Sequence, residues 1–129
     1  MIKDIQGGIN HATTTKKNIL NSFKYAFSGI YLALKKEKNM KIHFIIMLLV
    51  IIAGIIFKIS SYEWIMCITQ FGIVISLELL NTAIETTVDI AMPEINEKAK
   101  IAKDIAAGAV LVSAISSIII GLIIFMPKI

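Results

Sequence analysis

Residues 64–91 read WIMCITQFGIVISLELLNTAIETTVDIA, and this stretch decides the fold. Its first half is an apolar run, and its second half contains the polar residues Glu78, Asn81, Glu85 and Asp89. Steps of three and four residues place these side chains on one face of a single helix. The stretch therefore predicts a membrane helix over residues 63–91 with an acidic stripe along its second half.

Two further apolar runs flank this helix. One reads IHFIIMLLVIIAGIIF at residues 42–57, with a lysine at each end that can extend its reach, and the other runs without a charge from residue 105 to 126. Because runs of this length can cross a hydrocarbon core of about 30 Å, we expect membrane helices over 42–58 and 104–126. The sequence thus predicts an all-α integral membrane protein with three spans, as a single domain over residues 1–129.

The segment before the first span has a different pattern. Between Asn18 and Lys36, apolar residues recur with helical spacing and are interleaved with lysines. This pattern predicts an amphipathic surface helix over residues 18–38, lying in the membrane interface. A cytoplasmic helix that binds a partner protein is the alternative. Residues 1–17, with two glycines and three consecutive threonines, are expected to form a flexible tail.

Composition agrees with a membrane location. Of the 129 residues, 57% are hydrophobic and only 17% are charged, too few for a soluble domain of this size. Every basic residue is a lysine, and the lysines flank the apolar runs, which favours a membrane surface and argues against nucleic acid. They gather before the first and third spans, so the positive-inside rule predicts that the N-terminus and the acidic half of residues 63–91 are cytoplasmic.

The acidic stripe is the first candidate for chemistry, because ionisable groups inside a membrane are costly and usually functional. Glu78 is the deepest of these carboxylates, and a desolvated carboxylate suits a general base. Glu85, one turn after Asn81, could hold a divalent cation with a second carboxylate from elsewhere. Two alternatives stay open at this point. The stripe could mediate helix packing or ion pairing with lysines 98, 100 and 103, or it could form a proton or cation pathway.

Lys103 and Asp104 are expected at the cytoplasmic start of the third span. A lysine there can reach a phosphate, and a helix N-terminus adds a favourable dipole. The alternative is that Asp104 simply caps the helix. Neither a P-loop GxxxxGK[ST] nor a GxGxxG motif is present, so a nucleotide would be held in another way. His43, among apolar residues, is expected to be an interfacial anchor instead of a ligand.

These residues resemble one family. The run ELLNTAIETTVD at residues 78–89, followed by AKIAKDIAAGAV at residues 99–110, is similar to the signature of the small prokaryotic diacylglycerol kinase and undecaprenol kinase family, and SFKYA at residues 22–26 resembles its surface helix. The resemblance implies a homotrimer in the cytoplasmic membrane with active sites shared between neighbouring chains. It also implies transfer of the terminal phosphate of ATP to a lipid alcohol, with undecaprenol expected ahead of diacylglycerol.

The resemblance also implies roles for individual residues. Glu78 corresponds to the catalytic base, and Asn81 to a polar residue that organises the site. Glu37 and Glu85 correspond to the carboxylates that bind Mg²⁺ together with ATP. The remaining nucleotide contacts implied are Tyr25, Glu94, Lys103 and Asp104. The family's tyrosine–histidine pair after Glu94 is replaced here by Ile95 and Asn96. The rival hypothesis is a small oligomeric protein that conducts protons or cations along the acidic stripe.

Overall fold

The computed structural model describes the backbone of residues 2–129 and the side chains of residues 16–129. Its helices are α1 (Ile2–Lys36), α2 (Lys38–Ile56), α3 (Ser61–Ala91) and α4 (Glu97–Phe125), and a short 3₁₀ helix, η1 (Met126–Lys128), follows α4. The described residues contain no strand, so the all-α prediction is confirmed. The chain divides into two units, one up to Lys35 and one from Lys36 onward.

The first unit consists of α1, which begins well before the surface helix predicted over residues 18–38. Within it Ile19, Leu20, Phe23 and Phe27 have exposed side chains, as expected for a helix that lies on a membrane. The predicted flexible tail falls largely outside the residues whose side chains are described, and its flexibility stays a prediction. The helix ends at Lys36, because the backbone of Glu37 is extended (φ −94°, ψ 119°).

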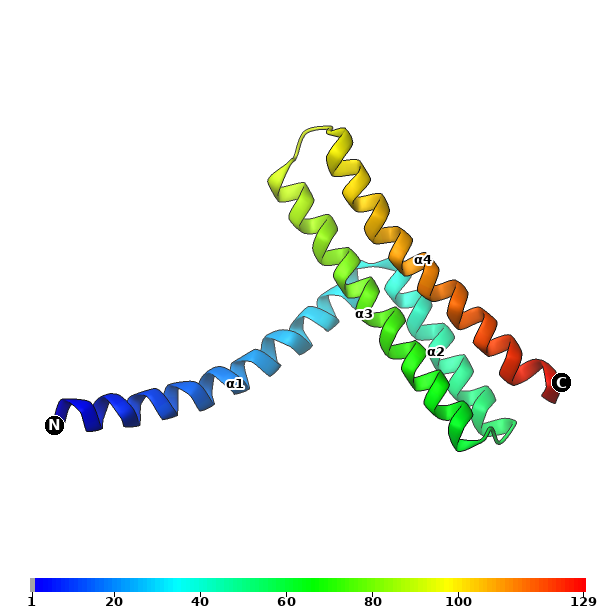
Figure 1. Cartoon of the computed structure of the whole chain (residues 1–129), viewed down its shortest axis with the longest axis horizontal. Helices are drawn as coiled ribbons and strands as arrows, with labels where there is room; N and C mark the ends of the chain where they lie inside the picture. Colours follow the sequence, from blue (N-terminus) through cyan, green and yellow to red (C-terminus); the bar gives the residue numbers. More distant parts are fainter. Residues whose placement is uncertain (1) are drawn as a thin grey trace. The chain divides into compact units, whose positions relative to one another are not determined.

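The second unit is a bundle of α2, α3 and α4, in which α3 packs against both other helices (Figure 1). All three are long and apolar enough to cross a membrane. In the most apolar window of each, only 11%, 17% and 11% of the residues, respectively, are buried within the chain. This much uncovered apolar surface needs lipid or further helices around it, so the prediction of an integral membrane protein is confirmed.

A tight turn joins α2 to α3. The amide groups of Lys58 and Ile59 donate to the carbonyls of Ile55 and Gly54, which is the Schellman arrangement, and Lys58 has the positive φ of 53° that it requires. Ser60 and Glu63 then form a reciprocal capping box that starts α3. The two helices are therefore held as a hairpin by backbone chemistry that the sequence provides locally.

The bundle is closed at the α2–α3 turn by a small core. Ile59, Cys67 and Ile124 are buried there, and Trp64 packs against them. The rings of Phe57 and Phe125 meet edge to face with centroids 6.1 Å apart. Lys128 Nζ donates to Glu63 Oε1 at 2.8 Å, which ties η1 to the start of α3. This end of the bundle is therefore fixed by packing and one ion pair.

The opposite end is formed by the connection between α3 and α4. Pro93 follows Met92 and stops α3, because the residue before a proline avoids helical angles. Asn96 caps α4 by accepting a hydrogen bond from the Ala99 amide at 3.1 Å. With 31 residues against 19 in α2, α3 is longer by about 18 Å at 1.5 Å per residue. The α3–α4 hairpin therefore extends past the start of α2 (Figure 1).

This start of α4 corrects one expectation. The third span was predicted over residues 104–126, with Asp104 as a possible cap and with the helix dipole acting at Lys103. The helix begins at Glu97 instead, so both residues lie about two turns inside it, where the dipole effect has faded. The reason is that the charged segment Glu97–Lys103, read from the sequence as a connector, continues the helix beyond the apolar run.

Candidate active site

A polar cavity of about 350 Å³ opens on α2, α3 and α4 at the level of the acidic stripe. Its polar lining comes from Asn39 and His43 of α2 and from Glu78 and Asn81 of α3. The apolar part of the wall is Ile42, Ala107, Val110, Leu111 and Ala114. Small and aliphatic residues of α4 thus face a group of hydrogen-bonding side chains.

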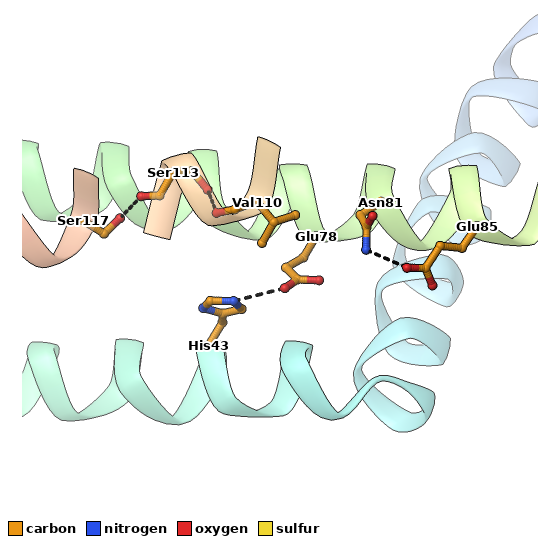
Figure 2. Close-up of polar contacts among 7 residues, drawn as sticks. All are labelled: His43, Glu78, Asn81, Glu85, Val110, Ser113 and Ser117. Atoms are coloured by element: carbon orange, nitrogen blue, oxygen red, sulfur yellow. Dashed lines mark hydrogen bonds and ion pairs between the residues drawn. The ribbon is translucent and has the colours of Figure 1, made fainter. Parts of the chain in front are cut away.

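Glu78 is the most deeply placed carboxylate of the stripe. Its side chain is only 3% exposed, and its Oε1 atom lies 3.1 Å from Nε2 of His43 (Figure 2). Because an ionised carboxylate can only accept hydrogen bonds, this contact requires the proton of the neutral imidazole to be on Nε2. Glu78 is buried, Glu85 half-buried and Asp89 exposed, which agrees with the prediction that Glu78 is the deepest carboxylate of the stripe. The interpretation of His43 as an interfacial anchor missed this contact.

Asn81 and Glu85 form the next part of the stripe, one turn further along α3. Asn81 Nδ2 donates to Glu85 Oε1 at 3.2 Å (Figure 2). The other amide atom, Asn81 Oδ1, is buried and has no hydrogen-bond partner among the described residues. A buried acceptor without a hydrogen-bond partner costs free energy of folding. This oxygen is therefore available to a ligand or a cation.

Asp89 ends the stripe and is held by an ion pair with Lys103 across the α3–α4 hairpin. Within α4, Lys100 pairs with Asp104, one helical turn later, at 2.6 Å. Ion pairing, one alternative for the stripe, therefore applies to Asp89. Lys103 is 37% exposed and Asp89 63%, so the pair is partly open to solvent, where an ion pair contributes little to stability.

The remaining residues implied by the family resemblance lie elsewhere. Glu37 is half-buried just ahead of α2, and Glu94 is exposed in the connection between α3 and α4. Tyr25 is exposed on α1, in the other unit of the chain. Among the described residues, the lining of the polar cavity includes Glu78 and Asn81 but none of these three. Asn96 is used as the cap of α4.

Magnesium would require oxygen ligands near Glu85. Within the part of the chain whose side chains are described, no group of three or more His, Cys, Asp or Glu residues is placed to hold a metal ion. Magnesium is commonly bound through one or two carboxylates together with water and substrate phosphates. The Glu85 carboxylate and Asn81 Oδ1, which has no partner among the described residues, offer oxygen ligands, so the residues present fit the ion.

Two residues of the site were not anticipated from the sequence, His43 and Asn39. A histidine inside an apolar run is a usable signal, because a polar ring at membrane depth needs a partner. His43 lies 35 residues from Glu78, however, so only the packing of α2 on α3 identifies that partner. Asn39, beside lysines at the start of α2, gave no comparable signal.

Comparisons with known proteins place the chain among relatives of one family. The family model described as prokaryotic diacylglycerol kinase matches residues 24–125. The chain is 46% identical to the undecaprenol kinase of Bacillus subtilis (strain 168) over 107 residues, covering 83% of this chain and 87% of that protein. It is 39% identical to a diacylglycerol kinase of Synechocystis sp. over 111 residues, covering 85% of this chain and 63% of that protein. It is also 31% identical to a diacylglycerol kinase of Haemophilus influenzae over 116 residues, covering 89% and 98% respectively.

The matched region begins within α1 and ends at the last residue of α4, so it contains the polar cavity and the acidic stripe. Both the three-helix architecture and the extent of the match support one assignment. The chain belongs to the prokaryotic diacylglycerol kinase family and is an integral membrane lipid kinase.

Proposed function

We propose that this lipid kinase transfers the terminal phosphate of ATP to the hydroxyl group of undecaprenol, with diacylglycerol as the second candidate acceptor. The observation that carries the proposal is the buried carboxylate of Glu78 in the wall of a polar cavity at membrane depth. The name of the Bacillus subtilis relative, undecaprenol kinase, supports the choice of acceptor. The named activities of all three relatives disfavour the ion-conducting alternative.

In this proposal Glu78 is the general base. The lipid hydroxyl approaches from the membrane, its O–H bond breaks, and the proton moves to the free oxygen of the Glu78 carboxylate. The lipid oxygen forms a bond to the γ-phosphorus while the bond from that phosphorus to the leaving ADP oxygen breaks. Such transfer needs little covalent work from the protein, so positioning and charge stabilisation supply most of the rate.

Glu85 and Glu37 would hold a magnesium ion together with the phosphates of ATP, and Asn81 would help to organise this group. When bound, magnesium neutralises the charge on the phosphates. The unpartnered Asn81 Oδ1 beside Glu85 supports a cation or its water ligands at this level of α3. Lys103, Asp104, Tyr25 and Glu94 are proposed contacts to the nucleotide, and Lys103 would exchange Asp89 for a phosphate.

The membrane orientation and the assembly complete the proposal. Lysines gather before α2 and at the start of α4, which favours a cytoplasmic location for the α3–α4 connection and therefore access to ATP. The three spans leave most of their apolar side chains uncovered within one chain, which supports a homotrimer with active sites shared between neighbours.

The proposal is tested by phosphate transfer from ATP in detergent micelles, with undecaprenol and diacylglycerol offered separately. We expect magnesium-dependent formation of the lipid phosphate and faster turnover of undecaprenol. A faster reaction of diacylglycerol would correct the acceptor. Failure to phosphorylate either alcohol, by protein shown to be folded and oligomeric, would contradict the proposal.

A further inference from the structure

His43 of α2 and Glu78 of α3 are joined by a hydrogen bond between their side chains. Among the residues whose side chains are described, His43 makes the one hydrogen bond to the Glu78 carboxylate, at 3.1 Å. The Glu78 side chain is 3% exposed and the His43 side chain 20% exposed, so both lie largely within the bundle. The residues come from different helices, α2 and α3, and their side chains point toward each other (Figure 2). The pair is therefore a tertiary contact that decides how the carboxylate is held.

The hydrogen bond treats the two carboxylate oxygens differently. His43 Nε2 contacts Oε1, and the second oxygen of Glu78, a residue that lines the polar cavity, has no hydrogen-bond partner among the described side chains. When Glu78 has taken a proton on that second oxygen, Oε1 becomes a carbonyl oxygen and can still accept from Nε2. The same contact can thus persist before and after proton transfer.

We infer that His43 is a positioning residue for Glu78, and this inference rests on the proposed role of Glu78 as base. By donating from Nε2 to Oε1, His43 fixes the rotamer of Glu78 and presents only the second oxygen to the lipid hydroxyl. A carboxylate side chain has several rotamers, and misplacement of a reacting group by about 1 Å can lower a rate by about 100-fold. His43 acts through this geometry and does not itself take the proton.

The position of His43 between two cavities supports the inference. An apolar cavity of about 340 Å³ adjoins the polar cavity, and His43 and Ala114 line both. The apolar cavity is otherwise formed largely by aliphatic and aromatic side chains, such as Val50 and Phe71. His43 therefore stands where hydrocarbon surroundings give way to polar ones, which is where a lipid hydroxyl would meet its base.

The test uses two substitutions of equal length. Glutamine places an N–H donor about as far along the side chain as Nε2, whereas methionine has a similar shape and no donor. We expect His43→Met to lower kcat by about 10- to 100-fold, with little change in the KM for ATP or lipid, and His43→Gln to retain most of kcat. The full-length oligomer in micelles is assayed, with thermal stability measured in parallel.

Each outcome is informative. Equal losses of kcat in both variants, or no loss in either, would overturn the inference, because the donor would then not matter. If His43→Met does not fold, His43→Asn is compared with His43→Gln instead. The asparagine side chain is one methylene shorter than glutamine, so its amide does not reach Oε1. A wild-type protein that transfers no phosphate would contradict the proposed function instead, whereas an active wild type with indifferent His43 variants would overturn only this inference.

Discussion

The Glu78 side chain is only 3% exposed, and among the described side chains its one hydrogen-bond partner is His43. A carboxylate with a basic partner such as lysine would be neutralised by an ion pair, as Asp89 is by Lys103. The two ends of the same stripe therefore have different chemistry. The proposed base, Glu78, has one carboxylate oxygen without a hydrogen bond among the described side chains, while Asp89 is paired with Lys103.

We expect Glu78→Gln to lower the rate of phosphate transfer by about 100- to 10,000-fold, because the amide cannot accept the hydroxyl proton. Fold and assembly should be retained, since the amide oxygen still accepts from His43 Nε2. Initial rates and size-exclusion profiles of wild type and variant measure this. Normal turnover would remove Glu78 from the role of base.

At the next turn of α3, we expect Glu85→Gln to raise the magnesium concentration needed for half-maximal rate. A neutral amide is a weaker ligand for a hard cation, although Asn81 can still donate to its oxygen. A magnesium titration at saturating ATP measures the shift. The matched control is Glu97→Gln, which removes an exposed carboxylate in the first turn of α4. An equal response of both variants would argue against a magnesium ligand at Glu85.

At the scale of elements, the α2–α3 hairpin shows how local rules and close packing combine. Lys58 occupies the left-handed position of the Schellman motif, where glycine is preferred. Gly54, one turn earlier, lies under the Trp64 ring, and a Cβ atom there would approach ring carbons to 2.7 Å and 2.9 Å. The backbone at Lys58 is strained because a residue with a Cβ atom adopts a positive φ there. The packing at Gly54 requires a residue without a side chain.

We expect Lys58→Gly to stabilise the protein by about 1 kcal/mol, because glycine adopts positive φ without the steric cost of a Cβ atom. Lys58→Ala removes the same charge but keeps the Cβ atom, so it should give no stabilisation. Thermal unfolding in detergent compares the three proteins. An equal gain for both variants would mean that charge, and not backbone strain, is responsible.

Gly54→Ala should have the opposite effect and lower stability by about 1–3 kcal/mol, since the added methyl group forces Trp64 or the helices apart. Gly72→Ala on α3 is the control, because nothing lies within 4 Å of a Cβ atom at that position within the chain. Thermal unfolding and tryptophan fluorescence report the change. If Gly54→Ala is as stable as Gly72→Ala, the approach of α2 to α3 does not depend on this glycine.

At the scale of the whole molecule, one chain buries few residues of its three spans, and among its described residues no group of three His, Cys, Asp or Glu side chains, Glu37 and Glu85 included, is placed to hold a metal ion. Both facts agree with a site completed by a neighbouring chain. We expect mixed oligomers of two inactive variants, Glu37→Gln and Glu78→Gln, to regain part of the activity, because some sites would then combine intact residues from different chains. Transfer rates are measured after co-refolding, with each variant alone as control. No recovery from proteins shown to have mixed would place both residues in one chain's site.

By itself, the sequence determined the elements and most of the candidate residues. A long apolar run satisfies its backbone hydrogen bonds in a bilayer by forming a helix, so the three spans could be predicted to within a few residues. The exception is the start of α4, which the charged residues 97–103 extend. The acidic stripe followed from helical spacing alone. The tertiary structure decided which polar groups meet: His43 with Glu78 and Lys103 with Asp89. It also decided that Asn81 Oδ1 has no partner among the described residues. Such pairings depend on how helices are rotated and packed against one another, and periodicity within one helix carries no information about its neighbour's register.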